Sequence, residues 1–333
     1  MRTLLRGLLA LIGIAAAIVA IGYFSLRRSD VDYAILAQTY ANEHSQHVVL
    51  PGGVRMHYRD EGARDGPILL LIHGFSFSLQ TWEPWVARLG DEYRLISIDL
   101  PGHGLTSAPG NYTPSMQRYV ADVEAFAAAQ GLERFTIIGN SMGGNVAWEY
   151  ALAHPERVEG LVLIGASGWE ETDEAQRREP AIFQLLRNPV LGPLMRDLDN
   201  TKLIRKGVEA SFADPALATD EIVARVSDLS RAPGHRAILL QLTLDYRARR
   251  FATNDLLAQI TAPTLILHGE RDNLVPVAQG RQFAAAIPGS ELVTWADEGH
   301  VPQEEHPDRS AAALRTFLEH ARARQGLNVT SPN

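Results

Sequence analysis

Short apolar runs alternate with helical patterns through most of the chain. Five of these runs are continuously apolar, which indicates strands that are buried on both faces of a sheet. They read PILLLIHG, YRLISIDLPG, FTIIGNS, VEGLVLIGAS and APTLILHGE. Helical patterns such as residues 114–130 and 143–154 lie between them. This alternation predicts an α/β fold with a mostly parallel central sheet, covered by helices on both faces.

Further patterns extend this core and interrupt it. The stretch HVVLPGGVRMHYRDEG predicts a hairpin, and SELVTWADEGH predicts a last strand. Residues 167–250 are charged, arginine-rich and helical in period, and nothing in them reads as a strand. We therefore expect an α/β core formed by residues 47–166 and 251–325, with a helical cap over 167–250. The last residues, 326–333, are predicted to be a disordered tail.

The N-terminus differs from the rest of the chain. Residues 7–26 carry no charge and are flanked by arginines on both sides. As a helix, this stretch would be about 30 Å long, the thickness of a bilayer core. Its apolar character continues past the alanines at 15–17, whereas a cleavable signal peptide usually has a shorter apolar region. We expect residues 1–28 to be a transmembrane anchor and 29–46 a linker; a signal peptide is the alternative.

This N-terminus also predicts a location. An anchor would place the catalytic domain beside the membrane, periplasmic or extracytoplasmic, and cleavage of the segment would make the protein secreted. The flanking arginines are balanced, so the positive-inside rule does not decide the orientation.

Composition narrows the classes of function. The chain has 333 residues, enough for a substantial core, and 46% of them are hydrophobic. Its net charge of −8 argues against nucleic acid as a partner, because phosphate binding needs a basic face. There is no cysteine, which excludes disulfides, thiolate metal sites and a cysteine nucleophile. Composition does not indicate the oligomeric state.

Reactive residue types follow several of the predicted strands. In a parallel sheet, ligands gather at the carboxyl ends of the strands. Ser141 follows FTIIGN, Asp272 follows TLILHGE, and His300 follows LVTWADEG. A serine, an acid and a histidine thus fall at one edge, in the order expected of a hydrolase whose serine occupies a strand-to-helix elbow.

The residues around Ser141 fit such an elbow. A serine on so sharp a turn sits in a sparsely populated backbone region, at a cost of about 1–3 kcal/mol. Side chains two positions away would collide with the strand and the helix, which explains Gly139 and Gly143. The turn points the Met142 amide at the start of the helix, where an anion is favoured. The alternative is that Ser141 is an ordinary turn residue between a strand and a helix, without a catalytic role.

A second amide is needed opposite Met142, and Phe75, after His73 and Gly74, is the best placed. Two such donors would stabilise a tetrahedral oxyanion by about 3 kcal/mol each. His300 would then accept the proton of the serine. Asp272 would hold the imidazole in one tautomer. This chemistry needs neither a cofactor nor a metal.

Other residues compete for these roles. The acid has three rivals in Glu170, Glu270 and Asp297. Among the other histidines, His73 and His268 each precede a glycine, which suits loop shaping, and His103 is a candidate pocket residue. Trp82 and Trp85 are interpreted as core residues.

The motifs HGF, DLPGHGLTSAP, GNSMGG, TLILHGERDNLVP and EGHVPQEEHP resemble the α/β-hydrolase fold superfamily. The resemblance covers about residues 47–322. GNSMGG together with EGHVP is similar to bacterial lipases and esterases with an N-terminal hydrophobic segment. It implies Ser141 as nucleophile, Asp272 as acid, His300 as base, and Phe75 and Met142 as oxyanion donors. The substrate would be a small-molecule carboxylic ester with an apolar, lipid-like acyl group.

Two alternatives remain at this stage. GNSMGG also resembles hydrolases of carbon–carbon bonds in ring-cleavage products, although their oxyanion loop tends to carry glycine and proline, unlike HGFSFSLQTW. A non-catalytic binding protein of the same fold is the other alternative. Epoxide and haloalkane hydrolases resemble a different elbow, with aspartate where this chain has Ser141. The motifs do not reveal the acyl length or the alcohol.

Overall fold

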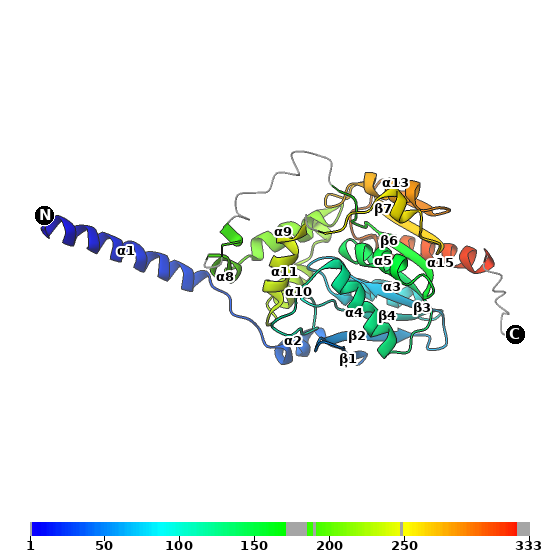
Figure 1. Cartoon of the computed structure of the whole chain (residues 1–333), viewed down its shortest axis with the longest axis horizontal. Helices are drawn as coiled ribbons and strands as arrows, with labels where there is room; N and C mark the ends of the chain where they lie inside the picture. The colour runs from blue at the N-terminus through cyan, green and yellow to red at the C-terminus, as the bar shows by residue number, and fades with distance from the viewer. Residues whose placement is uncertain (1, 171–184, 189–190, 247–248, 325–333) are drawn as a thin grey trace.

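The centre of the molecule is an eight-stranded sheet (Figure 1). The computed structural model describes residues 2–170, 185–188, 191–246 and 249–324. The strand order is β1-β2-β4-β3-β5-β6-β7-β8; only the pairs β1–β2 and β2–β4 are antiparallel. The strands are β1 (Ser45–Val49), β2 (Arg55–Gly62), β3 (Ile68–Ile72), β4 (Arg94–Ile98), β5 (Phe135–Asn140), β6 (Val158–Ile164), β7 (Thr264–Gly269) and β8 (Glu291–Trp295). The predicted mostly parallel sheet, with its N-terminal hairpin, is confirmed.

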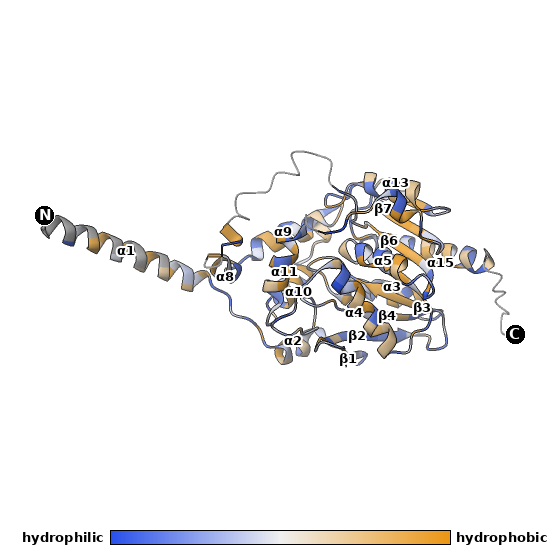
Figure 2. Ribbon diagram, in the orientation of Figure 1, coloured by the Kyte–Doolittle hydropathy of each residue, from blue (hydrophilic) through white to orange (hydrophobic). Residues whose placement is uncertain are grey.

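Helices cover both faces of the sheet because the strand residues alternate in direction. Leu70 and Ile72 of β3 belong to the apolar core shared with α4 (Met116–Ala129), α5 (Met142–Ala153) and α13 (Val277–Ala286). Leu69 and Leu71 point to the opposite core, shared with α3 (Glu83–Leu89) and α15 (Pro307–Arg324). Figure 2 shows these central strands in the hydrophobic colour.

The two tryptophans expected in the core lie in the second of these cores. Trp82, at the end of η1 (Leu79–Trp82), and Trp85 are both completely buried. The Trp85 indole donates a hydrogen bond to Ser310 Oγ over 2.9 Å, which joins α3 to α15. Their interpretation as core residues is confirmed.

Between β6 and β7 the described elements are all helical. They are α8 (Leu191–Arg196), α9 (Thr201–Ala210), η2 (Pro215–Leu217), α10 (Asp220–Ser230), α11 (His235–Leu244) and α12 (Asn254–Leu257). We call the described residues of 185–250 the cap segment. An isolated bridge at Leu198 is its one β interaction among these residues. The exact boundaries of cap, core and linker stay predictions, and residues 171–184 and the tail 326–333 lie outside the described part.

The N-terminal segment forms helix α1 (Arg2–Leu26), which projects away from the rest of the molecule (Figure 1). Spanning a bilayer takes about twenty consecutive apolar side chains. Among the residues that the structure describes, no helix offers a run of that length and apolarity. The prediction of a transmembrane anchor at residues 1–28 is therefore not supported.

The predicted linker, residues 29–46, is bound to the cap segment. Just before it, the Arg28 amide donates to Asp197 O over 2.8 Å, and its guanidinium pairs with Asp199 over 2.7 Å. Helix α2 (Tyr33–Tyr40) follows, and its Tyr40 hydroxyl donates to Asp228 of α10 over 2.9 Å. The segment thus leads the chain along the cap before β1 begins.

Candidate active site

Ser141 lies at the turn between β5 and α5, with φ 56° and ψ −116°. In the described part of the chain, the other non-glycine residue with positive φ is Ser76. A β-carbon on Gly139 would lie 2.1 Å from Gly143 O, and one on Gly143 would lie 2.2 Å from Ile72 O. Neither position has room for a side chain. The glycines are therefore required by the close approach of helix and strand, as the sequence predicts.

His300 and Asp272 are brought together at the carboxyl edge of the sheet. His300 Nδ1 lies 2.7 Å from Asp272 Oδ2. The other oxygen, Asp272 Oδ1, accepts the backbone N–H groups of Leu274 and Val275, each over 2.8 Å. Burial acts to raise the pKa of Asp272, but the facing His300 and the hydrogen bonds from imidazoles outweigh it. The pKa therefore lies well below its usual range, and the carboxylate stays ionised.

The backbone of His300 is joined to the elbow. The Asn140 side-chain amide, one residue before Ser141, donates to His300 O over 2.9 Å. A β-carbon on Gly165, after β6, would lie 3.0 Å from His300 Nδ1. No hydrogen bond joins the Ser141 hydroxyl to His300 among the residues described, and such bonds are often long without substrate. The three residues share one edge, and their assignment as a triad stays a prediction.

The two predicted oxyanion donors flank Ser141. Met142 begins α5, and Phe75 lies in a turn closed by the Phe77 amide on Gly74 O over 3.3 Å. A β-carbon on Gly74 would lie 3.2 Å from Ser141 Cβ, so this turn passes directly beside the serine. Both residues thus lie next to the serine, and the role of their backbone amides stays a prediction.

His73 is a structural residue of this edge. It is completely buried; its Nδ1 lies 2.8 Å from Gly74 O and its Nε2 accepts the Leu100 amide over 3.0 Å. His103 packs on it with ring centroids 4.8 Å apart. The expected loop-shaping role of His73 fits these contacts, and the pocket role of His103 remains untested.

Two residues at this edge carry roles that the sequence reasoning missed. His268 Nε2 lies 2.9 Å from Val275 O and 3.3 Å from Asp272 Oδ2, so a second imidazole faces the acid. Its spacing of four residues from Asp272 is the signal that could have revealed it. Asp99 directly follows β4 and is completely buried. Its carboxylate accepts a hydrogen bond from the Leu79 amide and is hydrogen-bonded to His57 Nδ1.

The three rival acids lie elsewhere. Glu270 faces Arg281 at 3.5 Å and accepts from Thr294. Asp297 pairs with Arg309. Glu170 is exposed. Of the four candidate acids, Asp272 is the one hydrogen-bonded to His300 among the described residues.

A cluster near the His300 loop has metal-ligand types. Ligand atoms of Glu298, Glu305 and His306 lie within 4.8 Å of one another. However, Glu298 already pairs with His306, at 3.0 Å, and with Arg309. Glu305 accepts three backbone amides. These partners already engage Glu298 Oε1 and both oxygens of Glu305, and they join the cluster to the backbone around the His300 loop.

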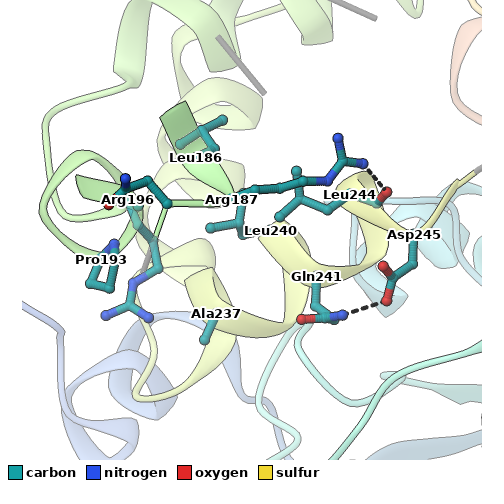
Figure 3. A pocket seen from close by; sticks show the side chains of 11 residues that line it. Leu186, Arg187, Pro193, Arg196, Ala237, Leu240, Gln241, Leu244 and Asp245 are labelled. Atoms are coloured by element: carbon teal, nitrogen blue, oxygen red, sulfur yellow. Dashed lines mark hydrogen bonds between the residues drawn. The ribbon is translucent and has the colours of Figure 1, made fainter. Parts of the chain in front are cut away.

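A cavity of about 510 Å³ opens in the cap segment between α8 and α11 (Figure 3). Leucines 186, 240 and 244 line it, with Arg187 and Gln241 at its polar side. Arg187 donates to Leu244 O over 2.8 Å, and Gln241 donates to Asp245. None of the predicted site residues lines this cavity, so the candidate active site remains the sheet edge at Ser141.

Buried histidines should make stability depend on pH. Burial lowers the pKa of His73, His103 and His235, so the unfolded chain binds these protons near its ordinary pKa of about 6.5 and the folded chain only at lower pH. Their contribution is complete above that pH and is lost as the pH falls below it. Asp99 and Asp272, with depressed pKa values, lose their contribution only at more acidic pH.

We therefore expect the free energy of unfolding to fall between pH 7 and pH 5, by up to about 1.4 kcal/mol per pH unit for each histidine. Urea unfolding at pH 7, 6 and 5 measures it. Replacement of exposed His320 by asparagine is the control and should leave the slope unchanged. A free energy of unfolding that is constant over this range would contradict the expectation.

Comparisons with known proteins agree with this geometry. A family model for the alpha/beta hydrolase fold matches residues 67–307, more than half of the chain. Lipase 1 of Psychrobacter immobilis is 29% identical over 286 residues, which cover 82% of this chain and 84% of the relative. The 2-hydroxymuconate semialdehyde hydrolase of a Pseudomonas species is 27% identical over 291 residues, with 83% and 94% covered.

One solved structure matches this chain over nearly the full length of both chains. It is described as a membrane phospholipase A and a novel bacterial virulence factor, and it is 28% identical to this chain with a TM-score of 0.69. The superposition covers 97% of this chain and 99% of that chain. The matched region contains the elbow at Ser141 and the loop of His300. The chain therefore belongs to the alpha/beta hydrolase fold family, and it is a hydrolase of that fold.

Proposed function

We propose that the protein hydrolyses carboxylic esters through an acyl-enzyme on Ser141. The observation that carries the proposal is the strained elbow, φ 56°, on the same sheet edge as the 2.7 Å His300–Asp272 hydrogen bond. Strain of this kind costs about 1–3 kcal/mol and is characteristic of functional sites. A plain turn residue would not need it.

The reaction follows from the positions of these groups. His300 accepts the hydroxyl proton as Ser141 Oγ attacks the ester carbonyl. The negative charge that develops on the carbonyl oxygen is stabilised by the amides of Phe75 and Met142. Collapse of this intermediate expels the alcohol, which takes the proton from His300. Water, activated by the same imidazole, then hydrolyses the acyl-enzyme. Asp272 stays ionised throughout and stabilises the imidazolium.

We further infer an apolar, lipid-like acyl group. Phe75 belongs to the turn that passes beside the serine, and its side chain, 38% exposed, offers an apolar surface there. Similarity to a lipase and to a membrane phospholipase A supports the same class of substrate. The acyl length and the alcohol are left to a substrate panel.

The proposal is tested with the full chain. A fluorophosphonate probe should label Ser141, and a p-nitrophenyl ester series should be turned over, with a preference for some acyl lengths. A non-catalytic binding protein of this fold would not react with the probe. Wild-type protein that is folded and yet neither labelled nor active on any ester would overturn the proposal.

Hydrolysis of a carbon–carbon bond is the second candidate. It is favoured by the similarity to a 2-hydroxymuconate semialdehyde hydrolase over 94% of that relative. The same panel separates the two, because 2-hydroxymuconate semialdehyde should be consumed faster than every ester if this candidate holds. The loop sequence HGFSFSLQTW, without the glycine and proline pattern of such enzymes, favours the ester.

We also infer a location at or beyond a membrane from the uncharged stretch 7–26. The protein would be membrane-anchored with its catalytic part periplasmic or extracytoplasmic, or secreted if the segment is cleaved. The full chain should then sediment with membranes, and a chain without residues 1–28 should stay in the supernatant. Ser141→Ala in the full chain is the control and should sediment as wild type. Equal sedimentation of the long and short chains would contradict the anchored form.

A further inference from the structure

The loop that carries His300 is packed against the cap segment. The His300 backbone amide donates to Ser211 O, at the end of α9, over 2.8 Å. A β-carbon on Gly299 would lie 2.5 Å from the Ala213 nitrogen, so the two backbones are in direct contact. Val301 is completely buried in the apolar cluster of the cap, beside Phe212. The residues on both sides of the predicted base are therefore held by the cap.

One carboxylate joins these two backbones. Glu305 ends α14 (Pro302–Glu305), the short helix that follows the His300 loop, and is 9% exposed. Its Oε2 accepts the Gly299 amide over 2.7 Å. Its Oε1 accepts the amides of Ala213 and Asp214 over 2.9 and 3.3 Å. Burial raises the pKa of Glu305, and these three amide hydrogen bonds act in the opposite direction.

The neighbouring residue, Glu304, adds a second connection between α14 and the cap segment. Glu304 lies 3.5 Å from Arg225 of α10 and accepts a hydrogen bond from Thr81 of η1. Helix α14 thus contacts the cap segment through two adjacent acids. Of these two carboxylates, that of Glu305 is the one that accepts a backbone amide of the His300 loop among the described residues.

We propose that Glu305 is a positioning residue that fastens the His300 loop to residues 211–214 of the cap, so that the predicted catalytic base is in place only while the cap is docked. This inference rests on the proposed role of His300 in ester hydrolysis. Asp272 holds the imidazole, whereas Glu305 and Ser211 O hold the backbone that carries it. Hydrogen bonds to a carboxylate are among the stronger ones, and a displacement of about 1 Å at a reacting group costs about a hundredfold in rate.

The test uses the labelling of Ser141 by a fluorophosphonate in the full chain. The amplitude counts folded sites, and the rate constant reports how well each folded site is activated. Glu305→Ala should lower the rate constant about tenfold to a hundredfold. Glu305→Gln should lower it less, because an amide oxygen still accepts from Ala213 while its N–H₂ group faces the Gly299 amide. Asp308→Asn, an exposed carboxylate three residues away, is the matched control and should label as wild type.

The labelling rate constant, its pH profile and a second variant distinguish a positioning role of Glu305 from a role in the stability of the fold alone. If Glu305 only stabilises the fold, its variants lose amplitude while the rate constant and its pH profile stay at wild-type values, and this result would overturn the proposal. Phe212→Ala loosens the cap side of the same contact. Its effect on the rate constant should not add to that of Glu305→Ala, because both act on one contact. Additive effects would show that Glu305 does not act through the cap.

These outcomes are distinct from failure of the proposed function. Wild-type protein that is not labelled at all removes the basis of both proposals. Wild-type protein that is labelled, together with Glu305 variants that label at the same rate, overturns the positioning role alone.

Discussion

Ser141→Ala is expected to lower kcat/KM for a p-nitrophenyl ester by about 10⁵-fold to 10⁶-fold, the loss seen when a serine nucleophile is removed. Ser141 occupies a backbone conformation with φ 56°, which is equally strained for serine and alanine. The substitution therefore removes the hydroxyl without changing the strain or the glycines beside it. The melting temperature should change little. Steady-state kinetics and thermal unfolding on the full chain measure the two effects.

A neighbouring serine gives the matched control for this prediction. Ser167 is buried beside the elbow, and its hydroxyl lies 3.4 Å from Ser141 O. Ser167→Ala removes a hydroxyl of the same size from the same region and should retain activity within a few-fold. Equal turnover by Ser141→Ala and wild type would sink the assignment of the nucleophile. Equal losses in both variants would point to damage of the elbow instead.

Asp272→Asn is expected to lower kcat by about 10⁴-fold, as in other hydrolases with this arrangement. The backbone amides of Leu274 and Val275 both donate to Oδ1, so an asparagine would place its oxygen there. Its N–H₂ group would then face His300 Nδ1, where the carboxylate now accepts. The imidazole would have to present a lone pair at Nδ1 and a proton at Nε2. In that tautomer it cannot accept the proton of the serine.

The rival acids provide the control for Asp272. Glu270→Gln removes an acid two residues away that faces Arg281 instead of His300. It should leave kcat within a few-fold of wild type. Comparable losses in the two variants would mean that the acid has been misassigned, and retained activity in Asp272→Asn would mean that this carboxylate is not needed. Both variants are compared with wild type by kcat and by unfolding in urea.

Several parts of the fold could be predicted because they depend on neighbours in the sequence. The continuous apolar runs of β3, β5 and β7 show burial on both faces whatever their partners are. Gly139 and Gly143 are required by the turn between them, which is a local geometric need. The N-terminal anchor rested on hydropathy alone, and none of the helices among the described residues combines the length and the apolarity that spanning a bilayer needs.

Other features depended on contacts between distant segments. His268 was interpreted as a loop residue, since the sequence does not show that its ring faces Asp272. Asp99 follows an apolar run in the sequence, and only the fold gathers backbone amides and His57 around it. Glu305 accepts hydrogen bonds from the backbone amides of Ala213 and Asp214, about ninety residues earlier in the chain. No periodicity or local motif encodes such a contact.

The sequence alone gives the chain order of serine, acid and histidine. It also determines the strand pattern and the elbow, because backbone sterics and burial act within a few residues. The pairing of His300 with Asp272, 28 residues earlier, and the docking of the His300 loop on the cap were decided by the tertiary structure. Hydrogen bonds of this kind form only when packing of the sheet and helices brings the partners within about 3 Å.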